Sequence, residues 1–234
     1  MTQAPRYFAL IPAAGVGARM GATSPKQYLK IGGKPMLRHT LDAFLSSELI
    51  AHTFVVVSPD DSYIDAVAPN HGVTVLRCGG ASRMESVRNG LAVLANTLAP
   101  ADRVLVHDAA RPGLTAELIE KLITGTGDHP AGGLLALPVV DTVKRCIDGE
   151  AAGTVPRNGL WLAQTPQMFR YELLREALAA AKDPDSITDD ASAVEALGLS
   201  PKLVEGHPRN LKVTLPDDIR IAEMYLAVSQ PELM

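Results

Sequence analysis

Apolar, β-branched runs alternate with helix-like patterns along most of this chain, and this alternation limits its possible folds more than any other feature. Strands and helices in regular succession build parallel βαβ units, and a series of such units gives a doubly wound α/β sheet. The expected strands lie near residues 7–11, 54–58, 73–77, 103–107 and 134–139. The expected helices lie near residues 36–47, 60–67, 82–97 and 115–124. We therefore expect an α/β protein with a mostly parallel, Rossmann-like sheet.

The regular alternation ends after Pro138. Residues 139–145 alternate like an exposed strand, Asp148, Gly149 and Glu150 form a turn, and residues 153–156 return, which predicts a protruding β-hairpin over about 139–156. Further on, the patterns predict helices near 171–181 and 189–197, a strand at 202–204, a strand-like run at 210–214 and a closing helix after 215–218. In the run at 210–214, alternation puts Lys212 and Thr214 on one face.

The length of 234 residues fits one large domain, so we expect a single domain over 1–234 that includes the hairpin. A net charge of −4 argues against nucleic acid as the main partner, because such partners usually require a basic face. No apolar stretch reaches the roughly eighteen residues of a spanning helix, and no secretory pattern opens the chain, so we expect a soluble, cytoplasmic protein without a membrane partner. Cys78 and Cys146 lack metal-site or paired spacing, which predicts two free thiols.

A glycine-rich loop follows the first expected strand and carries two cations. Gly15, Gly17 and Gly21 leave backbone N–H groups open to anionic oxygens, and Arg19 and Lys26 add positive charge. A phosphoryl-transfer site needs both positioning and neutralisation of negative charge. The G-x-G-x-x-G pattern of dinucleotide sites fails, because the third glycine comes one residue late, and no G-K-[ST] occurs. The alternative is a glycine turn that only connects strand to helix.

Asp108 follows the expected strand at 103–107, at the sheet edge where the glycine loop also opens. Ligands of open α/β sheets bind outside the carboxyl ends of the strands. One carboxylate beside a triphosphate suits Mg²⁺, which typically keeps several waters and takes phosphate oxygens as ligands. The alternatives are a helix cap or turn role for Asp108, or an ion pair with Arg111.

A second strand-to-helix turn, residues 79–87, combines two glycines with hydroxyl side chains. Bare backbone at this turn suits recognition of a nucleobase edge, while Ser82 and Glu85 have the spacing of a helix capping box. We expect the turn to serve both as a helix cap and as a site for a nucleobase.

Polar residues at 141–144, 157–161, 165–167 and 188–190 lie where plain connecting loops would suffice, and Trp161 suits a core or interface anchor better than a ligand stacker. No histidine metal pair or G-x-S-x-G elbow occurs, which disfavours hydrolases.

Together, these segments resemble the family of 2-C-methyl-D-erythritol 4-phosphate cytidylyltransferases over nearly the whole chain. The segments that carry the resemblance, in order, are PAAGVGARMGATSPKQYLKIGGKP, GGASRMESV, VLVHDAARP, DTVK, RNGLWLAQTPQ, ITDDAS and NLKVT. The resemblance implies a nucleotidyltransferase fold. It also implies a reaction of CTP with 2-C-methyl-D-erythritol 4-phosphate that gives the CDP-linked polyol and pyrophosphate, a step of non-mevalonate isoprenoid synthesis.

The resemblance also implies the roles of individual residues. Arg19 and Lys26 would stabilise the transition state, and Asp108 would hold the metal. Arg157 and Lys212 would place the phosphate of methylerythritol phosphate for attack. The remaining binding residues would be Ala13, Ala14, Gly15 and Gly17 for the CTP phosphates, Gly80, Ser86 and Ala109 for the cytidine, Thr142, Thr165 and Thr188 for methylerythritol phosphate, and also Arg111.

At one position this chain departs from the pattern of the family. Ala81 stands where some members carry an acidic residue, so a side-chain contact to the nucleoside is missing there, and recognition by the backbone is expected to remain. The nucleophile is a phosphate oxygen that is already largely ionised, so no general base is required. Orientation of two anions and charge neutralisation carry the reaction.

The resemblance further implies a homodimer in which the hairpin arms of two subunits embrace. An isolated hairpin is marginal in water, and a two-fold interface would let each arm cover the other subunit. Arg157 would then act either in its own subunit or in the neighbouring one. Two other functions stay open from the residues alone: another nucleotidyltransferase, for a sugar phosphate or the molybdenum cofactor, and a noncatalytic CTP-sensing module.

Overall fold

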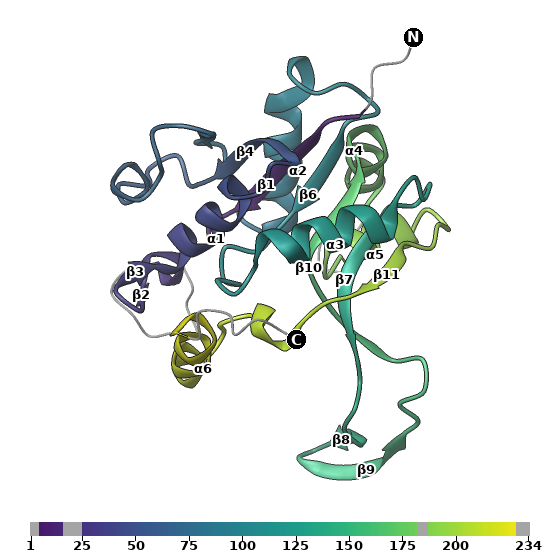
Figure 1. Ribbon diagram of the computed structural model, residues 1–234. Helices are drawn as coiled ribbons and strands as arrows, with labels where there is room; N and C mark the ends of the chain where they lie inside the picture. Colours follow the sequence, from purple (N-terminus) through teal and green to yellow (C-terminus); the bar gives the residue numbers. More distant parts are fainter. Residues whose placement is uncertain (1–4, 16–24, 182–186, 228–234) are drawn as a thin grey trace.

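A computed structural model describes residues 5–15, 25–181 and 187–227. Its main feature is a seven-stranded sheet with the strand order β11-β7-β10-β6-β1-β4-β5 (Figure 1). The strands are β1 (Tyr7–Pro12), β2 (Lys30–Ile31), β3 (Lys34–Pro35), β4 (Ile50–Val56), β5 (Val73–Leu76), β6 (Arg103–Val106), β7 (Gly133–Pro138), β8 (Val143–Ile147), β9 (Glu150–Val155), β10 (Trp161–Arg170) and β11 (Lys202–Glu205). The α-helices are α1 (Met36–Leu45), α2 (Arg83–Val93), α3 (Ala116–Thr126), α4 (Tyr171–Ala180), α5 (Asp190–Glu195) and α6 (Pro216–Ala227).

The sheet is mostly parallel and buried on both faces. β1 pairs in parallel with β4 and β6, β4 with β5, and β11 with β7, whereas β10 runs antiparallel between β6 and β7. Successive residues of β1 point to opposite faces, so Ala9 and Ile11 pack with α1 and α3, and Phe8 and Leu10 pack with α2, α4 and α5. The expected doubly wound α/β fold is confirmed.

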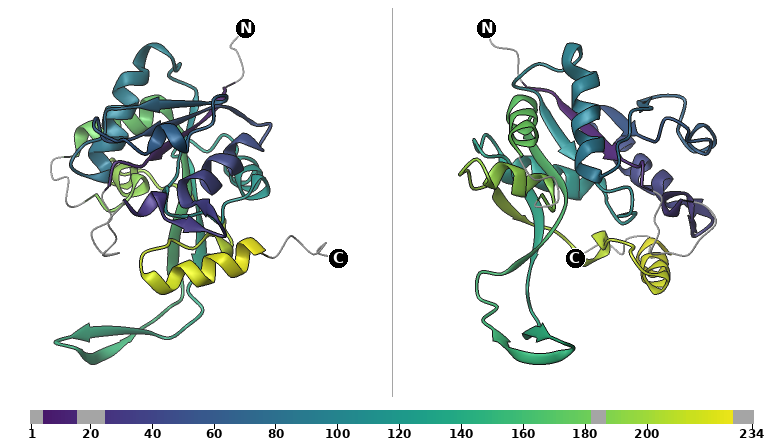
Figure 2. Two further views of the ribbon diagram at one scale, coloured as in Figure 1. Left: turned by 90° about the vertical axis from the view of Figure 1, so that its left-hand side faces the viewer. Right: turned by 180° about the vertical axis from the view of Figure 1, so that it is seen from behind.

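A third apolar cluster fixes the C-terminal helix near the carboxyl ends of the strands. Val213 and Ala222 pack there with Ile31, Met36 and Ala110. α6 therefore lies beside the β2–β3 hairpin, on the side of the sheet that faces the arm (Figure 2).

The protruding hairpin forms a separate two-stranded sheet of β8 and β9. We call residues 139–156 the arm, and it extends away from the body in every view (Figures 1 and 2). Asp148 and Gly149 take positive φ angles of 51° and 85°, the combination that a tight two-residue hairpin turn needs. The base of the arm is closed where the Val139 amide donates to the Leu160 carbonyl at 3.0 Å.

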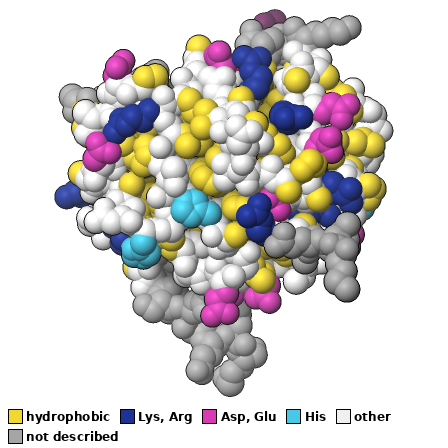
Figure 3. All heavy atoms as spheres, turned by 90° about the horizontal axis from the view of Figure 1, so that it is seen from above, with side chains coloured by type: hydrophobic (Ala, Val, Ile, Leu, Met, Phe, Trp, Pro, Cys, Tyr) yellow, Lys and Arg dark blue, Asp and Glu magenta, His cyan; other side chains and the backbone are white. Residues whose placement is uncertain are grey.

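The surface at the end opposite the arm carries both signs of charge. Figure 3 shows lysine, arginine and acidic side chains interspersed with apolar ones over the described part of this face. The distribution agrees with the small net charge of −4.

One strand was missed, and two expected elements were wrong. β10 was missed, because Gln164, Thr165 and Gln167 look like loop residues, yet these side chains are buried and hydrogen-bonded inside the protein. The helix expected at 60–67 is only a short 3₁₀ turn at Ile64–Ala66, because the Asp61 carboxylate accepts from the amides of Tyr63 and Ile64 and caps a turn. The strand-like run expected at 210–214 starts at the end of the 3₁₀ helix Pro208–Asn210 and continues as coil.

Although it is not a strand, the coil at 211–215 is fixed by contacts with the loop after β6. The Val213 amide donates to the Ala110 carbonyl at 2.8 Å, and Gly113 lies directly against the backbone of Arg209. A Cβ atom on Gly113 would overlap the carbonyl oxygen of Arg209. Gly113 is therefore required for the close approach of the segment that carries Lys212.

We predict that Gly113→Ala destabilises the protein, because the new methyl group must displace the backbone at Arg209. Overpacking of this kind costs about 1–3 kcal/mol. Urea unfolding would measure it, with Gly153→Ala as the control, since no heavy atom lies within 4 Å of a Cβ there. Equal stability of the two variants would show that the backbone moves aside at no cost.

Candidate functional site

A cleft of about 380 Å³ opens at the carboxyl ends of β1 and β6. Four segments meet around it: the loop after β1, the turn before α2, the loop after β6 and the coil before α6. This is the edge where a doubly wound sheet binds its ligands. The lining residues are Pro12, Ala13, Ala14, Gly15, Lys26, Gln27, Gly80, Ala81, Ser82, Arg83, Ser86, Asp108, Ala109, Ala110 and Lys212.

A second cavity of about 230 Å³ adjoins the cleft. Arg83, Asp108 and Lys212 line both spaces and so form the wall between them. The other residues of the second cavity are Arg111, Ala163, Gln164, Thr165, Gln167, Thr188 and Asp189. Two ligands that occupy the two spaces would meet at these three charged side chains.

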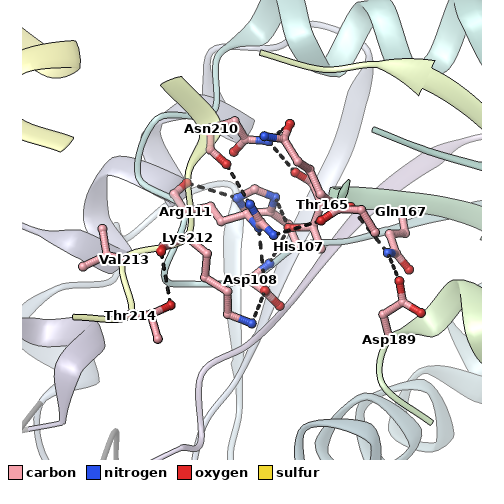
Figure 4. A network of polar contacts seen from close by, with 12 residues as sticks. His107, Asp108, Arg111, Thr165, Gln167, Asp189, Asn210, Lys212, Val213 and Thr214 are labelled. Carbon is pink, nitrogen blue, oxygen red and sulfur yellow. Dashed lines mark hydrogen bonds and ion pairs between the residues drawn. The ribbon is translucent and has the colours of Figure 1, made fainter. Parts of the chain in front are cut away.

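Asp108 is the buried anion at the centre of this wall, and three cations surround it. Its Oδ1 accepts from Arg83 Nε at 2.7 Å. Its Oδ2 lies 2.8 Å from Lys212 Nζ and 3.8 Å from Arg111 Nε (Figure 4). Burial raises the pKa of Asp108, but the attraction of Arg83 and Lys212 outweighs it and holds the pKa well below the usual range. Asp108 is therefore ionised at any physiological pH.

Arg111 holds the segment that carries Lys212. Its Nη1 donates to the Asn210 carbonyl at 2.8 Å, and Asn210 Nδ2 donates to the Thr165 carbonyl at 2.7 Å. The guanidinium is buried, its Nη2 also donates to the Ala163 carbonyl at 3.4 Å, and its Nε has no hydrogen-bond partner among the described residues. Arg111 thus joins the loop after β6 to the coil before α6 and sets the position of Lys212 over Asp108.

The Thr165 hydroxyl is committed to the loop after β6. It accepts from the Asp108 amide at 3.0 Å and lies 3.0 Å from His107 Nδ1 (Figure 4). His107 Nε2 lies 3.3 Å from the Arg111 carbonyl, which only a protonated Nε2 can satisfy, so the hydroxyl donates to Nδ1. Burial lowers the pKa of His107 to about 3, and the ring stays neutral.

The turn before α2 is built as expected at its N-cap and differs in its second contact. Ser82 Oγ accepts from the Glu85 amide at 3.1 Å, but the Glu85 carboxylate accepts from Ala81 and not from Ser82. Ser86 Oγ accepts from the Gly80 amide at 3.0 Å and donates to the Ser82 carbonyl at 2.9 Å. The amides of Gly80 and Ala81 are thus used inside the turn, and carbonyl and hydroxyl oxygens remain as acceptors.

The described part of the glycine loop is anchored through Gln27. This buried side chain donates from Nε2 to the Ala13 carbonyl at 2.7 Å and fixes residues 13–15 against the short 3₁₀ helix Lys26–Tyr28. Lys26 Nζ lies 3.4 Å from the Val213 carbonyl, and Lys26 lines the same cleft as Asp108. The two lysines that line the cleft, Lys26 and Lys212, therefore come from opposite ends of the sequence.

The structure brings most of the expected site residues together. The cleft collects Ala13, Ala14, Gly15, Lys26, Gly80, Ser86, Asp108, Ala109 and Lys212. The second cavity collects Arg111, Thr165 and Thr188, again with Asp108 and Lys212. Gly17 and Arg19 lie outside the described residues.

Thr142 and Arg157 are not brought to either space within the described part of this chain. Thr142 lies in the arm and Arg157 just past it, both exposed. Arg157 Nη1 donates to the Val140 carbonyl at the base of the arm.

Sequence reasoning missed Arg83, Asp190 and Gln27 as parts of the site. Arg83 and Asp190 stand inside motifs noted for their neighbours, at the first residues of α2 and α5. A buried bridge between two helix starts more than a hundred residues apart leaves no periodic signal in a sequence. Gln27 follows Lys26 directly, and only its burial reveals its role.

Among the described residues, no group of three or more histidine, cysteine, aspartate or glutamate side chains could hold a metal ion. Asp108 therefore does not belong to such a group among the described residues. Cys78 and Cys146 are free thiols, as expected. Within residues 5–15, 25–181 and 187–227, no helix is both long and apolar enough to cross a bilayer.

Comparison with known proteins gives one consistent result. Residues 7–228 match the model of the 2-C-methyl-D-erythritol 4-phosphate cytidylyltransferase family. The chain is 55% identical over 221 residues to the protein of that name from Chromobacterium violaceum, covering 94% of this chain and 97% of the relative. The homologue from Dechloromonas aromatica is 50% identical over 226 residues, covering 95% and 98% of the two chains. A crystal structure of 4-diphosphocytidyl-2C-methyl-D-erythritol synthase matches with a TM-score of 0.86 and 45% identity, over 96% of this chain and 100% of that one.

We predict that His107 makes the stability of the protein depend on pH. Its pKa is lower in the folded protein than in the unfolded chain, so the unfolded state binds the extra proton as pH falls below about 6.5, and stability is lost by up to about 1.4 kcal/mol per pH unit. In His107→Asn the amide oxygen still accepts from Thr165, but the proton uptake is gone. Urea unfolding of both proteins between about pH 6.5 and about pH 4.5 should give a shallower decline for the variant. Parallel declines would contradict the assignment of a buried, neutral ring.

Proposed function

Since the chain belongs to the 2-C-methyl-D-erythritol 4-phosphate cytidylyltransferase family, we propose how its two adjoining cavities divide the two substrates of this reaction. The enzyme is a nucleotidyltransferase that joins CTP and 2-C-methyl-D-erythritol 4-phosphate to give the CDP-linked polyol and pyrophosphate, in isoprenoid synthesis. The observation that carries the proposal is the shared wall of Arg83, Asp108 and Lys212, since the two anionic substrates must meet at one charged boundary.

CTP occupies the larger cleft, and methylerythritol phosphate occupies the second cavity. The triphosphate lies along Ala13, Ala14, Gly15 and Gly17. The Ala13 amide donates to the Val56 carbonyl at 2.7 Å, so among the described residues the amides of Ala14 and Gly15 are the donors to its anionic oxygens. Lys26 and Arg19 stabilise the charge that develops on the α-phosphate. Lys212 orients the phosphate of methylerythritol phosphate in the second cavity, which Thr165 and Thr188 also line.

The reaction is an in-line displacement. A phosphate oxygen of methylerythritol phosphate forms a bond to the α-phosphorus of CTP, the bond from that phosphorus to the bridging oxygen breaks, and pyrophosphate leaves with the electron pair. The nucleophile is already ionised, so the neutral His107 is not needed as a base, and it lines neither cavity among the described residues. The chain's own contribution is orientation and neutralisation of charge.

Ser86 and the turn before α2 select cytosine over uracil. The hydroxyl proton of Ser86 goes to the Ser82 carbonyl and the nearby amides are used inside the turn, so the surface offers acceptors. The exocyclic amino group of cytosine donates to such a surface, whereas the corresponding carbonyl of uracil leaves it unpaired. Ala81 adds no side-chain group, so recognition depends on these oxygens.

Asp108 is the proposed ligand for Mg²⁺. A single carboxylate together with phosphate oxygens and waters is the set that Mg²⁺ usually takes, and a bound Mg²⁺ would supply positive charge to the triphosphate. Asp108 lines the cleft, and its Oδ2 is paired at 2.8 Å with Lys212, whose side chain is 41% exposed and lines the same cleft. The donor chemistry therefore fits the ion.

The arm is the proposed dimerisation element of a single-domain subunit spanning 1–234. β8 and β9 form an isolated two-stranded sheet, which is marginal in water without a partner. Apolar side chains are exposed on the arm and at its base, among them Val140, Ile147 and Trp161. A two-fold homodimer covers these groups and brings Arg157 toward the other subunit's second cavity.

A cytoplasmic location is also proposed. Both cysteines are free thiols, and reduced thiols are typical of proteins in that compartment.

Pyrophosphate release measured across CTP, UTP, ATP and GTP, with and without methylerythritol phosphate, tests the substrate assignment. Release should require CTP together with methylerythritol phosphate. We predict that Ser86→Ala narrows the preference for CTP over UTP by about fivefold, since one neutral hydrogen bond contributes about 1 kcal/mol. The control is Ser62→Ala in an exposed loop, which should behave like the parent. An unchanged CTP-to-UTP ratio in Ser86→Ala would remove Ser86 from base selection.

Mixed dimers test the role of Arg157. The parent should have twice the 24.8 kDa chain mass in light scattering. Lys26→Ala and Arg157→Ala chains should each be nearly inactive alone. After mixing, heterodimers verified by mass should regain activity, because one of their two sites then has both residues intact. No recovery would assign Arg157 to its own subunit, and a monomeric parent would refute the dimer.

A further inference from the structure

Arg83 bridges two buried carboxylates that come from distant parts of the chain. Its Nε donates to Asp108 Oδ1 at 2.7 Å, and its Nη2 donates to Asp190 Oδ2 at 2.8 Å. The side chains of Asp108 and Asp190 are only 9% and 1% exposed. Charge-assisted contacts at these distances are strong and directional, so the bridge fixes how the three groups lie relative to one another.

The bridge connects the starts of two helices to the end of a central strand. Arg83 is the first residue of α2, Asp190 is the first residue of α5, and Asp108 follows β6. The start of α5 is itself fixed, because Asp189 caps the helix and Gln167 of β10 donates to Asp189 and accepts from the Ala191 amide. Arg83 is therefore anchored at Asp190 to a rigid point.

The anchor decides which oxygen of Asp108 faces the substrates. With Oδ1 held by Arg83, Oδ2 turns toward Lys212 and the cleft. The same bridge sets the distance from the turn before α2 to Thr188, which stands two residues before Asp190 in the second cavity. Asp190 itself lines neither cavity among the described residues, so it has no direct route to a substrate.

We propose that Arg83 and Asp190 are a positioning pair. The pair holds Asp108 Oδ2 toward the cleft and keeps Thr188 at a fixed distance from the CTP site. The inference rests on the proposed division of substrates between the two cavities. It goes beyond a stabilising ion pair, because it assigns to Asp190 an effect on turnover that it exerts only through Arg83.

The test compares Asp190→Asn, Arg83→Lys and the double variant with the parent. Asp190→Asn keeps the volume and one acceptor oxygen but loses the charge that anchors Arg83, and a lysine cannot span two carboxylates. Each should lower kcat about tenfold or more, since small misplacements of reacting groups cost up to about 10²-fold. The Kd for CTP, from calorimetry without the second substrate, should rise by a smaller factor than kcat falls, because the pair acts on the placement of Asp108 and Thr188. The double variant should be no slower than Arg83→Lys, since both changes break one contact.

The matched control is Asp102→Asn. Asp102 is also buried and paired with an arginine, at 2.7 Å from Arg6 Nη2, but it lies at the opposite end of β6. This variant should lose stability and keep the parent's kcat. A comparable fall in kcat there would mean that the effect is general destabilisation.

Two further results would overturn the inference. If Asp190→Asn keeps the parent's kcat while Arg83→Lys has a lower kcat, Arg83 acts on a substrate directly. If the two losses in kcat multiply in the double variant, the two residues act independently. Should Asp190→Asn not fold, Arg83→Lys decides alone, and a weaker CTP Kd with unchanged kcat refutes positioning. The parent is assayed first, so a parent that releases no pyrophosphate refutes the proposed function and is distinguishable from any variant result.

Discussion

The attraction between one buried carboxylate and the cations around it organises the functional end of this enzyme. Asp108 lies at the end of a central strand, and Arg83, Arg111 and Lys212 approach it from a helix start, its own loop and the C-terminal coil. A buried charge is costly unless it is paired, so each partner is needed to keep the others in place. Packing of the sheet fixes where Asp108 stands, and Asp108 in turn fixes three segments that the sheet alone does not hold.

The antiparallel strand β10 gives the site its second half. In a fully parallel sheet, the strand beside β6 would also end at the site. β10 runs antiparallel to β6, so residues within the strand lie beside the site. It therefore contributes Thr165 beside Asp108 and Gln167 against the start of α5. Polar side chains inside a sheet are tolerated because each finds a partner, and those partners are the loops that form the two cavities.

The sequence predicted features that depend on local pattern, and it failed where a contact spans the chain. The strand before Asp108, the Ser82 cap and the Asp148-Gly149 turn were all readable, because propensity and spacing act within a few residues. β10 was not, since its buried glutamines and threonine are polar, and only their distant partners explain their burial. Likewise Lys212 was recognised through the resemblance, but the coil that carries it is shaped by Arg111 and Gly113.

The narrow base of the arm separates it from the sheet that carries the two cavities. The Val139 amide donates to the Leu160 carbonyl and Arg157 Nη1 donates to the Val140 carbonyl at the base, and the strands beyond it form their own sheet. Insertions, deletions or exchanges beyond this closure do not alter the register of β7 against β10. A change in the arm can therefore alter its contact with a partner while the sheet that carries the two cavities keeps its strand pairing.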